Sequence, residues 1–319
     1  MKRIPLLLLL ILLITAISVT GCSKVDDGVP EETPDSSTEA ETTEPPEETG
    51  EPEPQIPELP PMLPDYLEFY EINEDVVGHL RIDGTKINYP VLQGPNNDFY
   101  MDHNIYKQED KINGSVTADY KNRFNGYEIS DNTVLFGHNN AGNFLSVGQL
   151  TRYYFGALDG SLAFYKSNPV VYFDTMYEKI EWKVFAGVLF NTQDRYGERV
   201  FFWNHTDFAN EKDFHDYIRM VMDRSPFFTD VDIEYGDQIL SLMTCYYPGP
   251  DVDARWVVFA RRVRPGESNE VDTSKAIFNR DYFRFGKSSG ESTWDTSYLK
   301  SLSGESGELP PVGKWRKYE

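Results

Sequence analysis

Apolar and polar residues alternate along much of the chain between residues 76 and 263, and turn-forming sequences separate the alternating runs. Alternation with a period of two is typical of β-strands, whose successive side chains point to opposite faces of a sheet. We therefore expect strands at residues 76–82, 87–92, 112–118, 132–137, 170–175, 180–191, 239–245 and 255–260. Many short strands, few helices and no internal repeat predict a mainly β domain built as a closed or nearly closed antiparallel barrel.

Apolar residues with helical spacing occur in only a few places. Residues 65–75 have the pattern of a short amphipathic helix that packs one face on the domain. The clearest helix begins after Asn210, which is a typical N-cap residue, and continues to Ser225. Its apolar residues fall at i, i+3, i+4, i+7 and i+8 and predict one buried face: Phe214, Tyr217, Ile218, Val221 and Met222. Short helical or irregular crossings are expected at residues 143–150 and 159–168.

Residues 1–21 have the pattern of a secretory signal peptide. A positively charged start precedes an apolar run at residues 4–17 and a small-residue site that ends at Cys22. This site resembles the lipobox of bacterial lipoproteins, which implies cleavage before Cys22, lipidation of its thiol and an anchor at the outer face of the plasma membrane. The alternative is an uncleaved membrane helix, although the uncharged run is just below the ~20 residues that span a bilayer. Both interpretations place the domain outside the cell.

Residues 22–64 are rich in Glu, Pro, Thr and Ser and contain few apolar residues. Such a segment cannot bury enough surface to offset its ordering entropy, so we expect an extended, solvated stalk. Its acidic residues account for more than half of the formal net charge of −22. The acidity therefore describes the stalk more than the folded domain, and no nucleic-acid partner is expected. An acidic stretch is sometimes an interaction site, but a self-repelling spacer is the simpler interpretation.

Residues 65–264 remain as one domain of ordinary size, large enough to bury a core. Residues 265–319 form a C-terminal extension that is rich in Ser and Gly, with scattered aromatic residues and paired prolines. The sequence predicts no function for this extension, although its aromatic residues are suited to packing on the domain.

The chain has two cysteines, Cys22 and Cys245. If Cys22 carries a lipid or lies in an anchor, Cys245 has no partner for a disulfide. An odd cysteine in an exported protein is either an intermolecular link or a reactive group. Cys245 ends an apolar strand, which disfavours the link. The next strand begins at Arg255, so we expect Cys245 and Arg255 to face each other across a hairpin.

Five histidines are candidates for a base beside this cysteine. His103 and His205 lie in polar loops and are expected at the surface, and His215 lies off the apolar face of its helix. His79 lies within a strand, where a structural histidine is more common than a catalytic one. His138 differs because it follows an apolar strand in a Gly-His-Asn-Asn turn, at the end of that strand. The pattern alone leaves both a structural and a catalytic role open for His138.

A metal site is not expected, because paired cysteines or histidines at ligand spacing are absent and acidic clusters occur mainly in the stalk. Glycine-rich phosphate loops are absent as well, so we expect no cofactor. A cysteine nucleophile needs a partner that takes its proton and a donor for the oxyanion that forms on an attacked carbonyl. His138 suits the first role, and Arg255, a permanently charged forked donor, suits the second.

Three segments in this order resemble the sortase family of cysteine transpeptidases. Ser241-Leu242-Met243-Thr244-Cys245 is similar to the family's Thr-Leu-x-Thr-Cys signature, Gly137-His138-Asn139 to its histidine turn, and Arg255-Trp256-Val257-Val258 to its arginine strand. The resemblance covers residues 65–264. The helix before the cysteine strand is similar to class B members.

The resemblance implies an eight-stranded closed barrel with short helices and a two-step reaction at the surface of a Gram-positive cell. Cys245 would attack the carbonyl after the threonine of a C-terminal sorting signal on a surface protein, giving a thioacyl enzyme. His138 would protonate the leaving amine and then deprotonate an amine of a cell-wall precursor or pilin. Arg255 would hold the substrate and stabilise the oxyanion, while Thr244 and Ser241 would contact the substrate.

The chain departs from the family pattern at Ser241, which replaces a threonine, and at His79, where the family often has tryptophan. No acidic residue closely follows Cys245, so no orienting carboxylate is assigned. One alternative is a catalytically silent surface lipoprotein that uses the sortase fold as a binding module. Another is a cell-wall cysteine peptidase. A papain-like peptidase predicts cysteine before histidine and a nucleophile at a helix N-terminus, which is the reverse of this chain.

Overall fold

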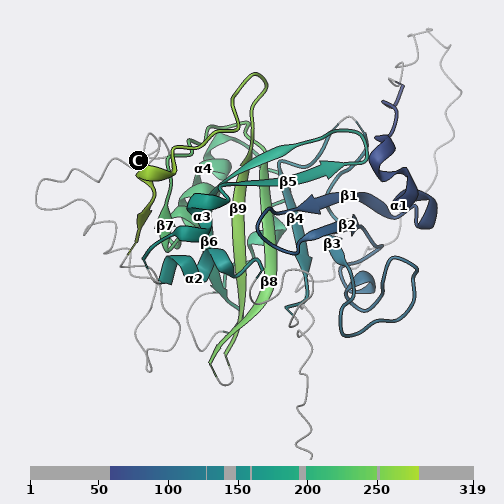
Figure 1. Ribbon diagram of the computed structural model, residues 1–319, viewed down its shortest axis with the longest axis horizontal. Coiled ribbons are helices and arrows are strands. Elements are labelled where there is room, and N and C mark those ends of the chain that lie inside the picture. Colours follow the sequence, from purple (N-terminus) through teal and green to yellow (C-terminus); the bar gives the residue numbers. More distant parts are fainter. Residues whose placement is uncertain are drawn as a thin grey trace, which may run out of the picture.

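The computed structural model describes residues 58–126, 128–139, 149–158, 160–193, 199–249 and 252–279. Their centre is a closed barrel of eight strands in the order β1-β2-β3-β4-β8-β9-β6-β5 (Figure 1). The strands are β1 (Val76–Arg81), β2 (Asn88–Leu92), β3 (Val116–Ala118), β4 (Asn132–Gly137), β5 (Val170–Thr175), β6 (Glu181–Asn191), β8 (Ile239–Gly249) and β9 (Val252–Arg262). The predicted mainly β barrel is confirmed.

Two neighbouring strand pairs differ from the expected antiparallel arrangement. β2 pairs with β3 in parallel, and β4 pairs with β8 in parallel, while the other neighbours in the barrel are antiparallel. The strand expected at 112–118 is shorter than expected, since its first residues form a turn and only β3 is extended. β8 continues past Cys245 to Gly249, with a register shift between Tyr246 and Gly249. The turn sequence after Cys245 therefore makes an irregularity within a longer hairpin.

The helices are short, with one exception. They are η1 (Pro64–Tyr66), α1 (Leu67–Ile72), η2 (Phe99–Met101), α2 (Arg152–Leu158), α3 (Ala163–Ser167), η4 (Phe202–Asn204), α4 (Glu211–Met222) and η5 (Thr273–Lys275). The predicted long helix is confirmed as α4, and the side chain of Asn210 accepts a hydrogen bond from the backbone N–H of Asp213 at 3.1 Å. α2 lies between the two expected crossings, α3 lies within the second, and residues 143–148 fall outside the described residues. Among the described helices, none combines the length and the apolarity that a membrane span requires.

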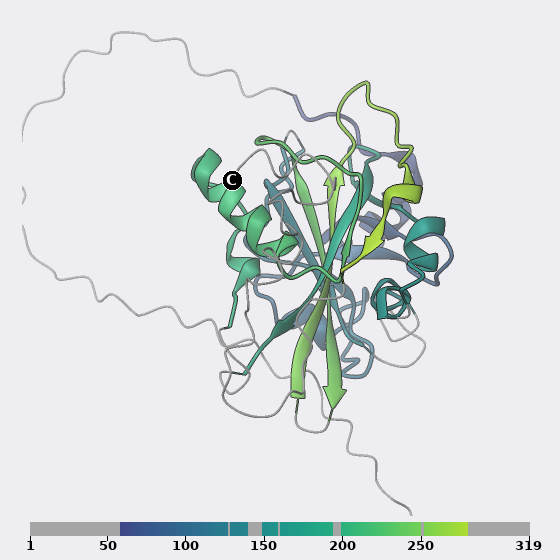
Figure 2. The same ribbon diagram turned by 90° about the vertical axis from the view of Figure 1, so that its left-hand side faces the viewer.

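Two apolar clusters hold the barrel and its helices together. The first contains residues from all eight barrel strands and from α2 and α3. The second lies between α4 and the strands β4, β6, β8 and β9. Figure 2 shows α4 on one side of the barrel and the teal α2 and α3 on the other. The five buried residues of α4 are those that the helical spacing predicts, so this helix packs on the sheet by its apolar face.

Residues after β9 pack back on the barrel through a buried ion-pair network. Arg261 is fully buried, and its two terminal nitrogens donate to the two carboxylate oxygens of Glu267 at 2.6 and 2.7 Å. Lys183 on β6 donates to the same carboxylate at 2.6 Å. Further along, β10 (Ile277–Phe278) pairs with β7 (Phe227–Phe228) in a separate two-stranded sheet. The folded region therefore extends past the boundary predicted at residue 264 and includes part of the C-terminal extension.

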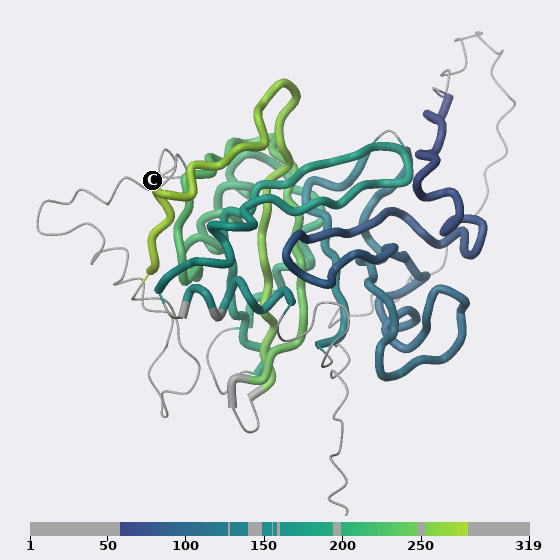
Figure 3. The backbone as a smooth tube through the Cα atoms, viewed as in Figure 1, coloured from purple at the N-terminus to yellow at the C-terminus, as the bar shows by residue number. Residues whose placement is uncertain are grey.

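The two ends of the barrel differ in what lies beside them. Figure 3 shows the purple N-terminal segment and α1 at one end, whereas the green β8–β9 hairpin extends from the other. The backbone N–H of Leu63 donates to the carbonyl of Met176 at 2.7 Å, which fixes the N-terminal segment beside the end of β5. The hairpin end contains Cys245 and Arg255.

Replacement of Glu267 by glutamine tests the buried network. Hydrogen bonds from Arg261, helped by Lys183, hold the pKa of the Glu267 carboxyl far below its usual range. We expect Glu267→Gln to lower the free energy of unfolding at neutral pH by about 3 kcal/mol, because the buried guanidinium then keeps only the more distant carboxylate of Asp232, at 3.5 Å. Since the pKa is lower in the folded state, this stabilisation is present above about pH 4.3 and is lost as the pH falls further.

Urea denaturation of the wild type and the variant at several pH values measures this effect. The difference in unfolding free energy should shrink as the pH drops below about 4.3. Glu270→Gln, at an exposed neighbouring position, is the matched control and should change little. A difference for Glu267→Gln that is independent of pH would contradict the role of the charge.

Candidate active site

The three residues predicted to do chemistry meet at one end of three neighbouring strands. β8 pairs with β9 in a register that places Cys245 directly opposite Arg255. β8 also pairs with β4, where Gly137 lies opposite Thr244. His138 follows Gly137 by one residue and therefore comes beside Cys245. The structure thus brings together His138, Cys245 and Arg255, which lie far apart in the sequence.

The side chains of these residues belong to one face of the sheet. Phe136 on β4, Met243 on β8 and Val257 on β9 belong to the apolar cluster beneath α4. Side chains two positions apart on a strand point to the same face. The residues two positions further toward the hairpin end are His138, Cys245 and Arg255. All three are buried, with 7%, 4% and 4% of their surface exposed, so their chemistry takes place in a largely desolvated setting.

Cys245 is disulfide-bonded in the structure, whereas the sequence argument expected a cysteine without a disulfide partner. The absence of a partner was predicted for a Cys22 that carries a lipid or lies in an anchor, and Cys22 lies outside the described residues. A cysteine acts as a nucleophile only as the thiolate. The reactive form of this site is therefore the reduced form.

His138 is held by contacts on both sides of the turn that carries it. Its Nε2 lies 2.8 Å from the carbonyl oxygen of Met101, at the end of η2. A carbonyl only accepts hydrogen bonds, so Nε2 carries a hydrogen and Nδ1 is the basic nitrogen of the neutral ring. The hydroxyl of Thr244 donates to the carbonyl of Gly137 at 3.0 Å, and the side-chain amide of Asn139 donates to the carbonyl of Cys245 at 2.6 Å. These two bonds fix the histidine turn to the cysteine strand.

Arg255 has a carboxylate partner that the sequence argument missed. One terminal nitrogen of Arg255 donates to Asp253 at 2.5 Å and to the carbonyl of Ala254 at 3.0 Å. The side chains of Arg255 and Asp253 are only 4% and 17% exposed. Thr192, just after β6, donates to the backbone carbonyl of Asp253 at 2.6 Å. The sequence did carry a signal: Asp253 lies two residues before Arg255, and residues i and i+2 of a strand share a face, yet no orienting carboxylate was assigned.

Thr244 and Ser241 lie inside the sheet. The Thr244 hydroxyl is used in the bond to Gly137, and the hydroxyl of fully buried Ser241 donates to the side chain of Asn132 at 2.7 Å. Asn132 in turn donates to the hydroxyl of Tyr217 on α4 at 3.0 Å. Both residues therefore join strands and a helix in this structure, and their predicted contact with substrate stays a prediction.

The other four histidines have structural surroundings. His79 stacks on Tyr66 with ring centroids 5.2 Å apart, and burial lowers the pKa of its ring. His103 stacks on a phenylalanine ring 4.2 Å away, and His205 lies against Tyr217. His215 was expected to be exposed, but its side chain is only 10% exposed because it packs beside Phe214. In the part of the chain that the structure describes, no group of ligating side chains is placed to hold a metal ion.

Comparison with known proteins agrees with this geometry. The sequence profile of the sortase domain matches residues 80–263. Sortase B of Staphylococcus aureus is 30% identical over 203 residues, which is 63% of this chain and 75% of the relative. The chain belongs to the sortase family. Sortase B of Listeria monocytogenes is 33% identical over 178 residues, which is 56% of this chain and 65% of the relative.

Solved sortase structures have the same fold. The complex of Staphylococcus aureus sortase B with MTSET has a TM-score of 0.52 and 28% identity, over 64% of this chain and 79% of that one. Clostridium perfringens sortase B has a TM-score of 0.53 and 28% identity, over 62% of this chain and 99% of that one. These relatives assign the chain to class B and support a cysteine transpeptidase. The predicted eight-stranded sortase barrel is confirmed.

The contact between Asp253 and Arg255 is expected to affect turnover in this sortase. Asp253→Asn removes the charge that holds the guanidinium opposite Cys245. A hydrogen bond to a charged group contributes about 1.5–3 kcal/mol, so we expect kcat to fall by about tenfold or more, because 1.4 kcal/mol corresponds to tenfold in rate. Cleavage of a fluorogenic sorting-signal peptide measures this. Asp253→Glu should restore part of the rate.

Asp230→Asn is the matched control for this measurement. Asp230 also forms an ion pair, with Lys275, and neither residue belongs to the strands β4, β8 and β9 that carry the site. Its replacement should leave kcat unchanged. Wild-type kinetics in Asp253→Asn would show that Arg255 keeps its position without the carboxylate.

Proposed function

We propose that this protein is an active class B sortase that joins a surface protein to a cell-wall amine through a thioacyl intermediate on Cys245. The observation that carries the proposal is the adjacency of His138, Cys245 and Arg255 at the same end of β4, β8 and β9. The family match supports a transpeptidase.

The first step forms the thioacyl enzyme. The thiolate of Cys245 attacks the carbonyl carbon after the threonine of a C-terminal sorting signal. A carbon–sulfur bond forms, and the negative charge moves to the carbonyl oxygen. Arg255 stabilises this oxyanion, since its guanidinium has five N–H donors and is able to bind Asp253 at the same time. When the carbon–nitrogen bond breaks, His138 gives a proton to the departing amine.

The second step transfers the acyl group to an amine of a cell-wall precursor or of a pilin lysine. His138, now neutral, takes a proton from that amine as its nitrogen attacks the thioester carbon. The new amide bond forms and Cys245 leaves as a thiolate. A thioester is reactive enough for an amine to resolve it, whereas the original amide is not. The thiolate of Cys245 and the protonated His138 are therefore regenerated without an external energy source.

The setting of the enzyme is part of the same proposal. We infer that Cys22 is lipidated and that residues 22–64 act as a spacer between the membrane and the barrel. Lipidation forms a thioether on Cys22, so a lipidated chain cannot use that sulfur in a disulfide.

A thioester on Cys245 is the direct test of the function. The chain from residue 58 onward, reduced beforehand, is incubated with a set of sorting-signal peptides and analysed by mass spectrometry. We expect an adduct on Cys245 with the mass of the cleaved acyl fragment, and none in Cys245→Ala. If the thiol reacts with an alkylating reagent but forms no adduct with any peptide, the chain is a silent binding module or a different peptidase.

Replacement of Cys22 tests the anchor. In cells that express the full chain, we expect globomycin to cause the precursor to accumulate, because lipoprotein processing occurs before Cys22. Cys22→Ala should remain unprocessed or lose its lipid, which metabolic labelling with a fatty acid measures. A wild-type chain that keeps its first 21 residues without the drug would indicate an uncleaved membrane helix.

A further inference from the structure

The orientation of the His138 ring depends on one backbone carbonyl outside the barrel strands. Nε2 of His138 lies 2.8 Å from the carbonyl oxygen of Met101, the last residue of η2. The side chain of Met101 packs against the apolar cluster beneath α4. A carbonyl that holds the hydrogen on Nε2 leaves Nδ1 as the basic nitrogen. The contacts that fix this carbonyl therefore decide which ring nitrogen of His138 reacts.

Gly114 lies directly against the Met101 carbonyl. Its φ of +55° is in the left-handed region, which glycine adopts without steric cost. A Cβ at this position would overlap the carbonyl oxygen of Met101 and would lie 2.7 Å from the carbonyl carbon. It would also lie 2.8 Å from the carbonyl oxygen of Tyr100, which accepts a hydrogen bond from the backbone N–H of Ser115 at 2.8 Å. These neighbours are backbone atoms and cannot rotate away, so any side chain at Gly114 displaces the carbonyl that binds Nε2.

Asp110 organises the turn that brings Gly114 to this place. Its backbone N–H donates to the carbonyl of Asp102 at 2.7 Å, and its carbonyl accepts from the N–H of Gly114 at 2.8 Å. The Asp110 carboxylate accepts hydrogen bonds from the backbone and the side-chain amide of Asn113, at 3.0 and 3.1 Å. Because Asp102 directly follows Met101 in the chain, these bonds tie η2 to the turn.

A second observation relates this turn to His138. The pKa of the Asp110 carboxyl is lowered, mainly because Asn113 donates hydrogen bonds to it and to a smaller extent because of its interaction with the charge of His138. The turn is thus connected to His138 both through the Met101 carbonyl and through space.

We propose that the turn at residues 110–114 positions His138, with Gly114 fixing the Met101 carbonyl and the Asp110 carboxylate fixing the turn. The inference rests on the proposed transpeptidase function, because it assigns the ring nitrogen that moves protons in that reaction. The imidazolium keeps the hydrogen on Nε2, in the bond to Met101, and gives the proton on Nδ1 to the departing amine. The neutral ring then takes a proton at Nδ1 from the incoming amine. The proton lost in the first step is therefore regained in the second.

The tautomer of His138 tests this inference without a substrate. The full chain, with isotope-labelled histidine and kept reduced, is studied by NMR at about pH 9, above the ordinary titration range of histidine. We expect the nitrogen chemical shifts to show a single Nε2–H tautomer in the wild type. Gly114→Ala should show a mixture of both tautomers, because it displaces the carbonyl, and His138→Gln assigns the signal. A wild type with the hydrogen on Nδ1, or an unchanged tautomer in Gly114→Ala, would overturn the proposal.

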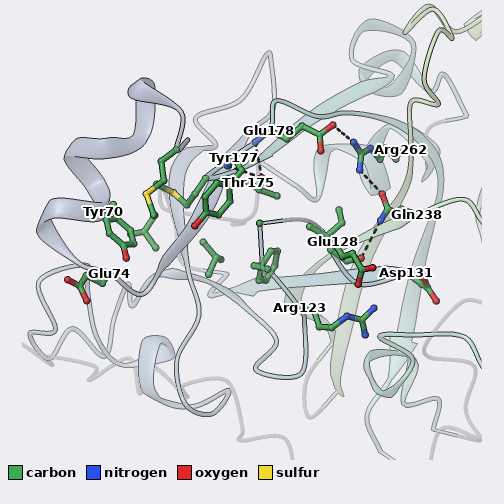
Figure 4. A pocket seen from close by; sticks show the side chains of 17 residues that line it. Tyr70, Glu74, Arg123, Glu128, Asp131, Thr175, Tyr177, Glu178, Gln238 and Arg262 are labelled. Carbon is green, nitrogen blue, oxygen red and sulfur yellow. Dashed lines mark hydrogen bonds and ion pairs between the residues drawn. The ribbon is translucent and has the colours of Figure 1, made fainter. Parts of the chain in front are cut away.

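Gly126→Ala is the matched control. Gly126 has a φ of +86°, and a Cβ there would lie 2.5 Å from a methyl group of Leu59. It lines the cavity beside α1 that Figure 4 shows, and the lining of that cavity includes none of residues 99–115. Its replacement therefore adds similar backbone strain without a contact to Met101 and should leave the tautomer of His138 unchanged. If Gly126→Ala also mixes the tautomers, the effect comes from general destabilisation and the proposal fails.

Two variants of Asp110 keep the test decisive if Gly114→Ala does not fold. Asp110→Ala removes the acceptor for the N–H of Asn113 and should mix the tautomers, whereas Asp110→Asn retains an oxygen acceptor and should keep a single one. With a sorting-signal peptide, we expect kcat of Asp110→Ala to fall by about tenfold at nearly unchanged KM, because proton transfer is misaligned while the substrate still binds. A single Nε2–H tautomer in Asp110→Ala would exclude the carboxylate from this role.

The two readouts separate this inference from the proposed function. If the wild type forms no thioester with any peptide, the proposed function fails, while the tautomers still decide whether the turn positions His138. If the thioester forms but the tautomers are the same in the wild type, Gly114→Ala and Asp110→Ala, the function stands and the positioning role is wrong.

Discussion

The parallel pairing of β4 with β8 is the constraint on which the chemistry of this protein depends. It sets the register that brings His138 beside Cys245, and the bonds of Thr244 and Asn139 fix that register at the strand ends. Parallel neighbours cannot be joined by a tight turn and need a long crossover. Here the crossover contains α2, α3, β5, β6 and α4, and part of it closes the barrel. The long interval between histidine and cysteine is thus a requirement of the pairing itself.

β9 carries a buried arginine near each end of one face, and each has a carboxylate partner. Arg255 pairs with Asp253 at the hairpin end, and Arg261 pairs with Glu267 at the other end. Val257 and Phe259, between them, belong to the apolar cluster beneath α4. A buried guanidinium is costly unless its charge is matched. Both buried arginines are therefore stabilised by a carboxylate. The pair of Arg261 with Glu267 attaches the segment after β9 to the barrel, and the pair of Arg255 with Asp253 holds a cation opposite Cys245.

Local patterns predicted the parts of the fold that depend on local physics. Strand alternation and the apolar face of α4 were visible in the sequence because burial on one face imposes them. The parallel pairing was not visible, because it is decided by packing between distant segments. The contact of His138 with Met101 uses a backbone carbonyl, and any residue at that position supplies one. Asp253 was not predicted as the partner of Arg255, although two residues that are two positions apart on a strand point to the same face.

The barrel separates where the chain is attached from where it reacts. The N-terminal segment enters beside Met176, whereas Cys245 lies toward the hairpin end of β8. If the proposed anchor and spacer precede this segment, the attachment pulls on the end of the barrel that carries no catalytic group. The segment then joins the domain through α1 and β1, and neither of these elements carries a residue of the site.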